Sequence, residues 1–476
     1  MKGLPNITTD FAEWYQAVVY QAELADQAPV RGCMVIRPYG YALWEEMQGY
    51  FNQKFKETGH QNAAFPLLIP LSFLQKEANH VEGFAPEVAV VTHAGGKKLE
   101  EPLVVRPTSE TIIHHMYARW LRSWRDLPIK LNQWCSVVRW EMRPRPFLRT
   151  TEFWWQEGHT AHETEQEARE EAETMHKLYY DFVQNILAIP ATAGIKPEHE
   201  KFAGADATYT IESMMQDGKA VQMCTSHRIS QSFAKAFDMK FQDRSGNLAY
   251  PYLTSWGSTT RLIGAMIMTH GDQKGLVLPP AIAPIQAVIV PIVKAENRQE
   301  VSSYAESVAQ QLRSANIRVH VDARDEMTPG AKFYEWELKG VPIRIEIGPR
   351  DMAAEQMVIV QRHTGEKATY QTMLCAEKIT TLLKQIQKDM FTRAKQRQDV
   401  QWHVTNEPLS TLGPKLKEAN GFYQVGWNGK TEAVEALKEY QGTIRCILPT
   451  KNATRCFYSG EESKYDTIDY ERNIFV

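Results

Sequence analysis

Three features of other protein classes are missing from this sequence: a long hydrophobic run, abundant cysteine and an excess of charge of one sign. The longest apolar stretch, residues 281–293, is broken by proline and glutamine and is too short to span a bilayer. The first residues, Met1 to Pro5, lack the apolar core of a secretory signal. We therefore expect no membrane partner and no secretory route.

Cysteine is scarce, with six residues scattered over a chain of 476. This usage is typical of a reducing compartment with free thiols and argues against a disulfide framework. The cytoplasm is therefore the expected location.

The charges nearly balance, with a formal net charge of −3. No global field draws in a polyanion, so the bulk charge argues mildly against a nucleic-acid partner, which local clusters would have to hold. With 43% hydrophobic and 23% charged residues, the composition is that of a globular protein. The length suffices for two or three domains, and no repeats or low-complexity tracts are present.

A stiff, proline-rich linker at residues 279–284 is the best candidate for a domain boundary. Before it, apolar spacing predicts helices at 40–59, 110–124 and 162–187, a partly helical segment at 221–241 and a short strand at 63–70. Because Pro66 cannot donate to a strand ladder, the strand at 63–70 should lie at a sheet edge or an interface.

After the linker, strands and helices alternate, which predicts a small α/β domain with a mixed sheet. The expected strands are 286–293, 318–322, 343–348 and 357–361, and the expected helices are 298–313, 331–339 and 370–388. A basic, polar stretch at 388–397 leads to a last segment of mixed character.

The most informative stretch reads as two strands, 131–141 and 152–161, joined by a loop rich in proline, arginine and aromatic residues. Side chains alternate along a strand, so each strand should present polar groups on one face. These groups are Arg139 and Glu141 on the first strand and Trp155, Glu157 and His159 on the second; the loop adds Arg143, Arg145, Phe147 and Arg149. The set suits an anionic, planar ligand such as a nucleotide. The alternative is a hairpin with an ordinary exposed polar face.

Thr108 and Glu110 form a second candidate constellation, because a hydroxyl and a carboxylate can bind an amine. The alternative is a plain helix N-terminus, where Thr and Ser cap and Glu lies in the first turn.

A third constellation follows Gly257, which permits close approach of the backbone. Arg261 then falls in the first turn of a helix, where it can bind a phosphate. The alternative is a glycine turn into a buried helix, with Arg261 in a structural ion pair.

The three constellations occur in the order of the three motifs of class II aminoacyl-tRNA synthetases, and the sequence resembles prolyl-tRNA synthetase. The resemblance runs from about residue 10 to the C-terminus and weakens after residue 400. The matching segments are RPTSE at 106–110, FLRT at 147–150, WQEGH at 155–159, KFAGA at 201–205, TSH at 225–227, SWGSTTR at 255–261, KFYEWE at 332–337, GVPIR at 340–344 and GPRD at 348–351.

The resemblance implies an α+β protein of three domains. Residues 1–283 would form the class II catalytic domain, an antiparallel sheet flanked by helices. Residues 284–387 would form an α/β anticodon-binding domain. Residues 388–476 would form a small α+β C-terminal domain, similar to a zinc-binding type that has lost its ligands.

The resemblance also implies substrates and roles: ATP with Mg²⁺, L-proline and tRNA(Pro). Catalysis would depend on Arg139, at the α-phosphate and the amino acid carboxylate, and on Arg261, at the γ-phosphate. The proline site would comprise Thr108, Glu110, Arg139, Trp155, Glu157, His159 and Ser255. The ATP site would comprise Arg139, Glu141, Phe147, Arg149, Thr150, Gln222, Thr225 and Arg261, with Phe147 against the adenine. His227 would lie near the tRNA 3′ end.

In the second domain, Glu337, Arg344 and Arg350 are the candidates for reading anticodon guanines. Arginine can contact guanine through paired hydrogen bonds, and glutamate can accept from base amino groups. The alternative is a solvated cluster of surface salt bridges.

The C-terminal segment departs from the zinc-binding pattern of some relatives, which uses four cysteines. Asn428 follows Trp427 where a cysteine is expected, residues 432–434 hold none, and only Cys456 of the last pair is kept. Cys446 is not at a ligand position. One thiolate cannot make a closed tetrahedral site, so we expect no structural zinc and no other metal site. The terminal tyrosine of the family is also missing, since the chain ends Ile474-Phe475-Val476.

Two further expectations concern editing and assembly. The interval between the hairpin and Ser255 has no room for the editing insertion of bacterial-type relatives. A proline pocket excludes alanine only weakly, so we expect Ala-tRNA to form and not to be cleared. Pro66 and the preceding helix match the subunit contact of the family, which implies a homodimer. The alternatives are a synthetase-like regulatory paralogue and another class II specificity, such as threonine or histidine.

Overall fold

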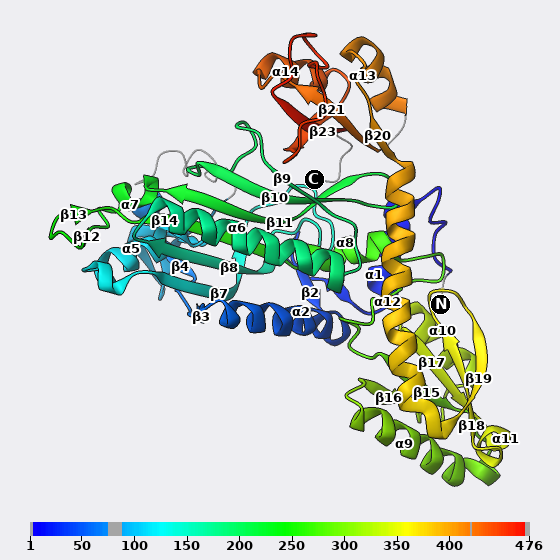
Figure 1. Ribbon diagram of the computed structural model, residues 1–476. Coiled ribbons are helices and arrows are strands. Elements are labelled where there is room, and N and C mark those ends of the chain that lie inside the picture. Colours follow the sequence, from blue (N-terminus) through cyan, green and yellow to red (C-terminus); the bar gives the residue numbers. More distant parts are fainter. Residues whose placement is uncertain (1–2, 75–87, 419–420, 472–476) are drawn as a thin grey trace.

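A long sheet organises the molecule in the computed structural model, which describes residues 3–74, 88–418 and 421–471 (Figure 1). Neighbouring strands in its central part pair antiparallel. In spatial order these strands are β10 (Ala207–Met214), β11 (Ala220–Ser230), β14 (Tyr252–Thr259), β8 (Glu152–His162) and β7 (Ile129–Val138). The sheet continues to β9 (Thr192–Ile195) at one side and to β3 (Gln61–Asn62) at the other.

One face of this sheet is covered by helices. Helix α6 (Glu165–Asp181) packs along it, starting at the Thr164 N-cap, whose side chain accepts from Glu167 N. Helix α2 (Pro38–Glu57) joins it, because Phe51 lies 4.2 Å from Phe182 between ring centroids and Phe55 lies 4.8 Å from Trp256.

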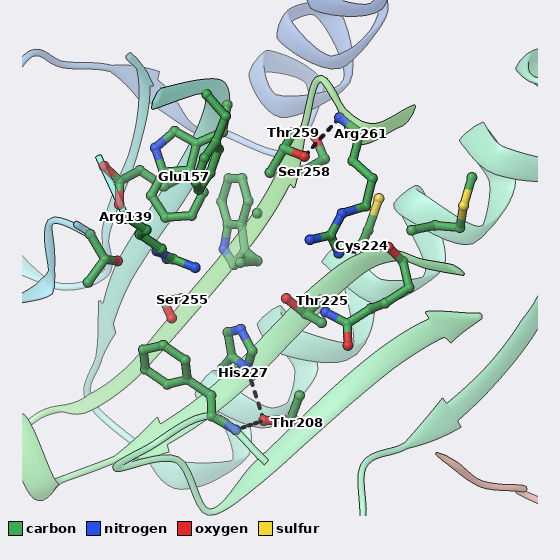
Figure 2. A pocket seen from close by; sticks show the side chains of 18 of the residues that line it. Arg139, Glu157, Thr208, Cys224, Thr225, His227, Ser255, Ser258, Thr259 and Arg261 are labelled. Atoms are coloured by element: carbon green, nitrogen blue, oxygen red, sulfur yellow. Dashed lines mark hydrogen bonds between the residues drawn. The ribbon is translucent and has the colours of Figure 1, made fainter. Parts of the chain in front are cut away.

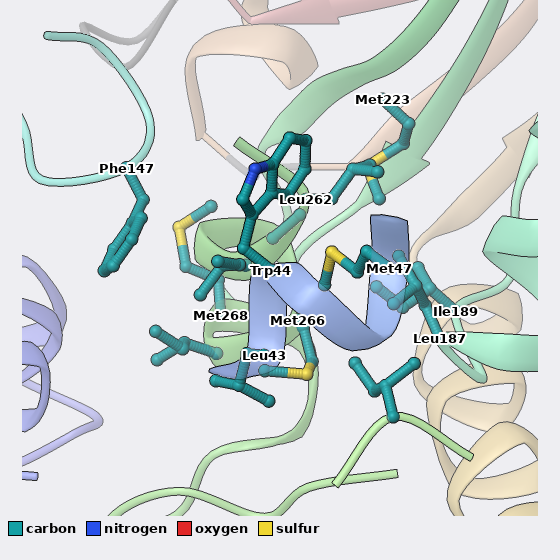
Figure 3. Packing of buried hydrophobic residues seen from close by; sticks show 14 of the residues in the cluster. Leu43, Trp44, Met47, Phe147, Leu187, Ile189, Met223, Leu262, Met266 and Met268 are labelled. Carbon is teal, nitrogen blue, oxygen red and sulfur yellow. The ribbon is translucent and has the colours of Figure 1, made fainter. Parts of the chain in front are cut away.

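These contacts belong to the largest buried core, which Figure 3 shows from close by. Leu43, Trp44 and Met47 of α2 gather there with Leu262 and Met266 of α8 (Arg261–His270).

Gly158 explains how a tryptophan fits against the middle of the sheet. A Cβ at this position would lie 2.1 Å from the ring of Trp256, which faces it across the β8–β14 pair. The absence of a side chain at Gly158 therefore leaves room for the Trp256 ring against the sheet. The face that carries this ring is used for packing in the core.

Smaller elements surround the central sheet. At the N-terminus are α1 (Phe11–Gln21), β1 (Ala25–Gln27) and β2 (Met34–Ile36). A small antiparallel sheet has the order β4 (Leu68–Pro70), β6 (Lys97–Val105) and β5 (Ala89–Ala94), flanked by α3 (Leu71–Leu74) and α5 (Glu110–Trp120). After β11 come α7 (Ser232–Ala236), β12 (Phe241–Gln242) and β13 (Leu248–Ala249).

The second domain has its own sheet in the order β16-β15-β17-β18-β19. Strand β15 pairs parallel with β16 and β17, and the pairs β17–β18 and β18–β19 are antiparallel, so the sheet is mixed, as predicted. The strands are β15 (Ala287–Pro291), β16 (Val319–Val321), β17 (Ile343–Ile347), β18 (Gln356–Gln361) and β19 (Lys367–Gln371). The helices are α9 (Arg298–Ser314), α10 (Pro329–Leu338), α11 (Pro349–Ala353) and α12 (Cys375–Val400).

Helix α12 leads from this domain to the C-terminal segment, which lies beside β9 and β10 (Figure 1). The boundary placed at 387–388 from the sequence falls inside this unbroken helix. The segment contains β20 (Trp402–Val404), α13 (Leu409–Glu418), β21 (Phe422–Trp427), α14 (Thr431–Lys438), β22 (Gly442–Ile447) and β23 (Tyr465–Glu471). Strand β22 pairs with β9 at Ile447 and Ile195, which extends the central sheet into this segment.

Several sequence-based elements need correction. The segment 221–241 is helical in part, as expected, at α7, but residues 221–230 belong to the strand β11, which the sequence did not predict, because their apolar side chains serve a buried central strand. The helix predicted from 370 begins at Cys375, since Tyr370 pairs with Met357 in the sheet. The helix predicted at 110–124 ends at Trp120, and the one at 162–187 begins at Glu165.

Two strands are shorter than predicted. Strand β7 ends at Val138, so Arg139 and Glu141 follow the strand rather than share one of its faces. The Arg139 amide still donates to Thr151 O at 2.8 Å, after which the proline-containing loop departs. The strand at 63–70 is confined to β4, which lies at a sheet edge, while Pro66 precedes it.

No helix within the described ranges combines the length and the apolar character that crossing a membrane requires.

Candidate active site

A cavity of about 820 Å³ opens on the central sheet, opposite the face that α6 covers. All of the residues that the sequence suggested for proline, ATP and the tRNA 3′ end line it. They are Thr108, Glu110, Arg139, Glu141, Phe147, Arg149, Thr150, Trp155, Glu157, His159, Gln222, Thr225, His227, Ser255 and Arg261. Segments far apart in the sequence thus contribute to one site.

Strand register explains why these residues meet. Ser255 of β14 lies opposite His159 of β8 and opposite His227 of β11, and Gly257 lies opposite Glu157 and Thr225. Side chains directly across from one another in a sheet point to the same face. The alternating residues of three strands therefore form the floor of the cavity, and the residues between them pack under α6.

Arg139 and Arg261 approach the cavity from opposite sides, and Figure 2 shows their guanidinium groups pointing toward one another. Arg139 Nε donates to Pro107 O at 2.9 Å, and its guanidinium carbon lies 5.4 Å from the centroids of Phe153 and Trp155. These contacts aim the side chain into the cavity and stabilise its charge.

Arg261 begins α8, and its guanidinium is held by backbone carbonyls: Nε donates to Leu148 O and Nη1 to Gln222 O, both at 3.3 Å. Burial, followed by the charge of Arg139, lowers its pKa to about 10, so it stays cationic at neutral pH. Among the described residues no carboxylate lies within ion-pair distance of it, which excludes the structural ion pair considered above. Two converging cations favour a polyanion between them.

A buried acidic pocket adjoins this pair. Thr108 Oγ1 donates to Glu110 Oε2, and Ser109 Oγ donates to Glu157 Oε1. Although Ser109 is the N-cap of α5, its side chain makes no capping hydrogen bond. The Thr108 and Ser109 hydroxyls therefore donate to the carboxylates instead of capping the helix. The simple capping alternative is therefore wrong.

Glu157 and His159 form a pair within that pocket, with His159 Nε2 3.0 Å from Glu157 Oε2. Burial would raise the pKa of Glu157, but hydrogen bonds with His159 and Ser109 outweigh it and lower the pKa. Burial would lower the pKa of His159, but Glu157 and the charge of Glu110 raise it. The lowered pKa keeps Glu157 anionic at neutral pH, where it holds the His159 ring. Glu110, with which no cation pairs among the described residues, is then the carboxylate available to an amine.

Two polar atoms in the same region are buried without a hydrogen-bond partner among the described residues: Ser255 Oγ and His159 Nδ1. Buried polar groups are usually paired. Their position beside Glu110 is therefore suited to a small ligand that carries hydrogen-bonding groups.

The other end of the cavity is formed by the loop after β7. Arg149 Nε donates to Glu141 Oε2, and Arg143 N donates to Glu141 Oε1 at 2.7 Å, so the loop is closed on itself. Phe147 has a φ of +59° and is 1% exposed; it borders the cavity and also belongs to the core (Figure 3). Thr150 Oγ1 donates to Glu152 O at 2.7 Å.

His227 lies at the floor beside Thr208, with Nδ1 3.0 Å from Thr208 Oγ1 (Figure 2). Burial, together with the nearby charges of His159 and Arg139, lowers its pKa to about 3. The imidazole is therefore neutral at physiological pH.

The sequence reasoning missed part of the lining. Thr208 could have been found from strand alternation, had the strand been recognised. Lys196 and Glu200 follow β9, and Thr443 and Arg445 come from β22, more than two hundred residues away. No local pattern in the sequence brings the last two to this cavity.

The three anticodon candidates do not line the cavity and have different surroundings. Glu337 pairs with Lys274, whose Nζ lies 2.9 Å from Oε1, at the contact between the first two domains. Arg344 donates to Glu346 Oε1 through Nη2 at 2.9 Å, and its guanidinium lies over Phe333. Arg350 is exposed on α11.

The donor set at the positions where the resemblance would place zinc ligands does not fit zinc. Asn428 Nδ2 donates to Ser459 Oγ and to Glu461 Oε2, each at 3.1 Å, and Lys430 Nζ donates to Glu461 Oε2 at 2.9 Å. Cys456 is buried in an apolar cluster. A closed zinc site needs four ligands, usually thiolates or imidazoles, and hydrogen bonds occupy these positions instead. Across the described part of the chain, no three His, Cys, Asp or Glu side chains are grouped to hold a metal ion. The chain end, Ile474–Val476, lies outside the described residues.

Comparison with known proteins agrees with this geometry. Residues 92–270 match the tRNA synthetase class II core domain (G, H, P, S and T), and residues 286–385 match the anticodon binding domain. The chain is 53% identical over 467 residues to proline--tRNA ligase 2 of Clostridioides difficile (strain 630), covering 97% of this chain and 96% of that protein.

Other relatives give the same result. The proline--tRNA ligase of Chloroherpeton thalassium is 52% identical, over 96% of both chains. That of Symbiobacterium thermophilum is 50% identical over 98% of this chain and 97% of its own. The fold is thus a class II synthetase core followed by an anticodon-binding domain, and the chain belongs to the proline--tRNA ligase family of class II aminoacyl-tRNA synthetases.

Proposed function

We propose that this protein is an active proline--tRNA ligase, which condenses L-proline with ATP to prolyl-adenylate and transfers the prolyl group to the 3′ end of tRNA(Pro). The observation that carries the proposal is the convergence of Arg139 and Arg261 on one cavity that also holds the carboxylate of Glu110, which makes no ion pair within the described residues. A triphosphate and an amine are the two charges that this arrangement complements.

In the first step an oxygen of the proline carboxylate attacks the α-phosphorus of ATP. A carbon–oxygen–phosphorus link forms, the bond from the α-phosphorus to the bridging oxygen breaks, and pyrophosphate leaves with the electron pair. The nucleophile is already anionic, so little proton transfer is needed and the work is positioning and charge stabilisation. In this proposal Arg139 binds the α-phosphate and the carboxylate, and Arg261 binds the γ-phosphate.

The two substrates would occupy different ends of the cavity. Glu110 and Thr108 receive the secondary ammonium of proline, while Trp155, His159 and Ser255 surround its ring. The adenine would lie against Phe147 near Glu141, Arg149 and Thr150, and Gln222 and Thr225 would border the nucleotide. Mg²⁺ would enter with the phosphates, as is usual for a cation bound through few protein carboxylates.

In the second step the terminal ribose hydroxyl attacks the prolyl carbonyl, AMP leaves and the hydroxyl proton is lost. In this proposal His227, which lines the floor of the cavity, lies near the 3′ end of the tRNA, where its neutral imidazole can accept a hydrogen bond. For the anticodon, exposed Arg350 is the best-placed candidate. Arg344 and Glu337 would have to exchange their present partners, Glu346 and Lys274, for RNA bases.

Assembly and location remain parts of the proposal. Leu67, Leu68, Val90 and Trp120 are large apolar side chains exposed on or near the small β4-β6-β5 sheet. Exposed apolar patches of this kind support a subunit contact, and we propose a homodimer through this surface. The scattered free cysteines support the cytoplasm as its compartment.

The test is pyrophosphate exchange into ATP with purified protein and a panel of amino acids. We expect exchange with proline and far weaker exchange with alanine. Exchange with threonine or histidine instead would indicate another class II specificity. No exchange with any amino acid, in a protein that still binds tRNA, would favour the regulatory alternative.

A further inference from the structure

The active-site cavity has a wall that the C-terminal segment supplies. Thr443 and Arg445, both on β22, line the same cavity as Arg261. Gly194 on β9 makes this approach possible, since a Cβ there would lie 2.7 Å from both Cys446 Sγ and Ile447 O. The C-terminal segment is therefore in close contact with the sheet beside the residues through which it reaches the site.

Arg445 is part of a buried ion cluster at this seam. Its Nη2 and Nε donate to Glu212 Oε2 at 2.8 and 3.2 Å, and Lys196 Nζ lies 2.9 Å from Glu212 Oε1. The Glu212 side chain is fully buried, yet the charges of Arg445 and Lys196 outweigh burial and lower its pKa to about 2. Two cations therefore flank one carboxylate. Arg445 Nη1 takes no part in the ion pair with Glu212.

A short path leads from this cluster to Arg261. Glu212 pairs directly with Gln222 across β10 and β11, next to a β-bulge at Ile211 and Glu212. The carbonyl oxygen of Gln222 accepts the hydrogen bond from Arg261 Nη1. The position of strand β10 at Glu212 thus affects the position of the Gln222 carbonyl, and this carbonyl orients the Arg261 guanidinium.

We propose that Arg445 is a positioning residue for ATP: by holding Glu212 it fixes the β10–β11 bulge and hence the orientation of Arg261. This inference rests on the proposed function and adds the C-terminal segment to the nucleotide site. It predicts a specific loss, because the proline end of the cavity lies on other elements, with Glu110 on α5 and Glu157 and His159 on β8. Within the described residues, these side chains share no hydrogen bond with the ion cluster.

The competing explanation is that Arg445 only stabilises the contact between domains. A second arginine of the chain provides a control. Arg362 is also a buried arginine that donates across a domain contact, through Nη1 and Nη2 to Asp272 at 2.7 and 2.6 Å. It does not line the cavity. Replacing it removes an ion pair at another contact between domains, with a carboxylate that is 43% exposed rather than buried, and leaves the path to Arg261 untouched.

The experiment measures proline-dependent pyrophosphate exchange and thermal midpoint for the full-length wild type, Arg445→Met, Arg445→Lys and Arg362→Met. We expect Arg445→Met to raise KM for ATP about tenfold, within the range of coupling through a contiguous network, and to leave KM for proline nearly unchanged. Arg445→Lys should recover part of the loss because it keeps the charge. Arg362→Met should lower the thermal midpoint and leave KM for ATP unaltered.

The inference is overturned if KM for ATP is unchanged in Arg445→Met, or if the KM values for ATP and proline rise together. Should Arg445→Met fail to fold, Glu212→Gln in the otherwise unchanged chain must show the same selective rise, and its absence counts equally against the inference. A wild type without proline-dependent exchange would instead refute the proposed function.

Discussion

Glu110 and Glu157 are both buried carboxylates of one pocket, and their neighbours give them different tasks. Glu157 is matched by His159 and accepts from Ser109 and Gln133, which fixes it as part of the pocket wall. Within the described residues, Glu110 accepts a hydrogen bond only from the Thr108 hydroxyl, and no cation pairs with it. We therefore assign the binding of the proline ammonium to Glu110.

Replacing Glu110 by Gln should therefore raise KM for proline by about 10- to 100-fold, the value of a hydrogen bond to a charged group. KM for ATP should change much less, because Arg139 and Arg261 are untouched. Steady-state pyrophosphate exchange at varied proline and ATP measures both. A proportional rise of the two KM values would contradict this assignment.

At the scale of elements, alternation along β8 predicted correctly that Trp155, Glu157 and His159 share a face. The same reasoning failed for Arg139 and Glu141, since β7 ends before them. It also missed β11, because a buried central strand and a buried helix look alike in a short apolar run. The pairing of β22 with β9 could not be predicted at all, since strand partners distant in sequence leave no local signal.

Helix α6 is anchored to the sheet by an ion cluster that makes stability depend on pH. His60 Nε2 and Lys130 Nζ lie 2.9 and 2.6 Å from the two carboxylate oxygens of Glu171. Burial alone would raise the pKa of Glu171, but these partners lower it from 4.5 to about 2. Between these values the folded protein binds fewer protons than the unfolded chain, so this contribution is present above about pH 5 and is lost toward pH 2.

We expect the thermal midpoint to fall as pH decreases from 5 to 3, and to fall less in Glu171→Gln, which cannot ionise. The difference corresponds to at most about 3 kcal/mol. Thermal unfolding at a series of pH values measures it. Parallel curves for the two proteins would show that Glu171 does not contribute.

The turn between β21 and α14 is held by hydrogen bonds to Ser459 and Glu461. Because Asn428, Ser459, Glu461 and Lys430 already satisfy one another, we expect metal analysis of the pure protein to find no stoichiometric zinc. A chelator should leave the thermal midpoint unchanged. Stoichiometric zinc, or destabilisation by the chelator, would be the contrary result.

At the scale of the whole molecule, the arrangement of the first domain is relevant to the discrimination between proline and alanine. The interval between β8 and β14, residues 163–251, is fully described and forms α6, β9, β10, β11, α7 and the small β12–β13 pair, all packed on or beside the central sheet. No separate domain is inserted within these residues. We therefore expect discrimination against alanine to depend on the synthetic pocket, where missing methylenes are worth about 1–3 kcal/mol.

We therefore expect Ala-tRNA to accumulate when alanine replaces proline in the charging assay, at about a tenth to a two-hundredth of the efficiency for proline. Ala-tRNA supplied to the protein should remain intact over the time of the assay. Rapid enzymatic hydrolysis of that Ala-tRNA would show an editing activity that this account does not include.

The central claim is that Arg139 and Arg261 bind one ligand between them while Glu110 binds its amine. A crystal structure with L-proline and a non-hydrolysable analogue of ATP tests it most directly. The account predicts the α-phosphate at Arg139, the γ-phosphate at Arg261, the adenine against Phe147, and the ring nitrogen of proline at Glu110 and Thr108. Ligands bound outside this cavity, or a proline bound in it with its ring nitrogen away from Glu110, would contradict the account.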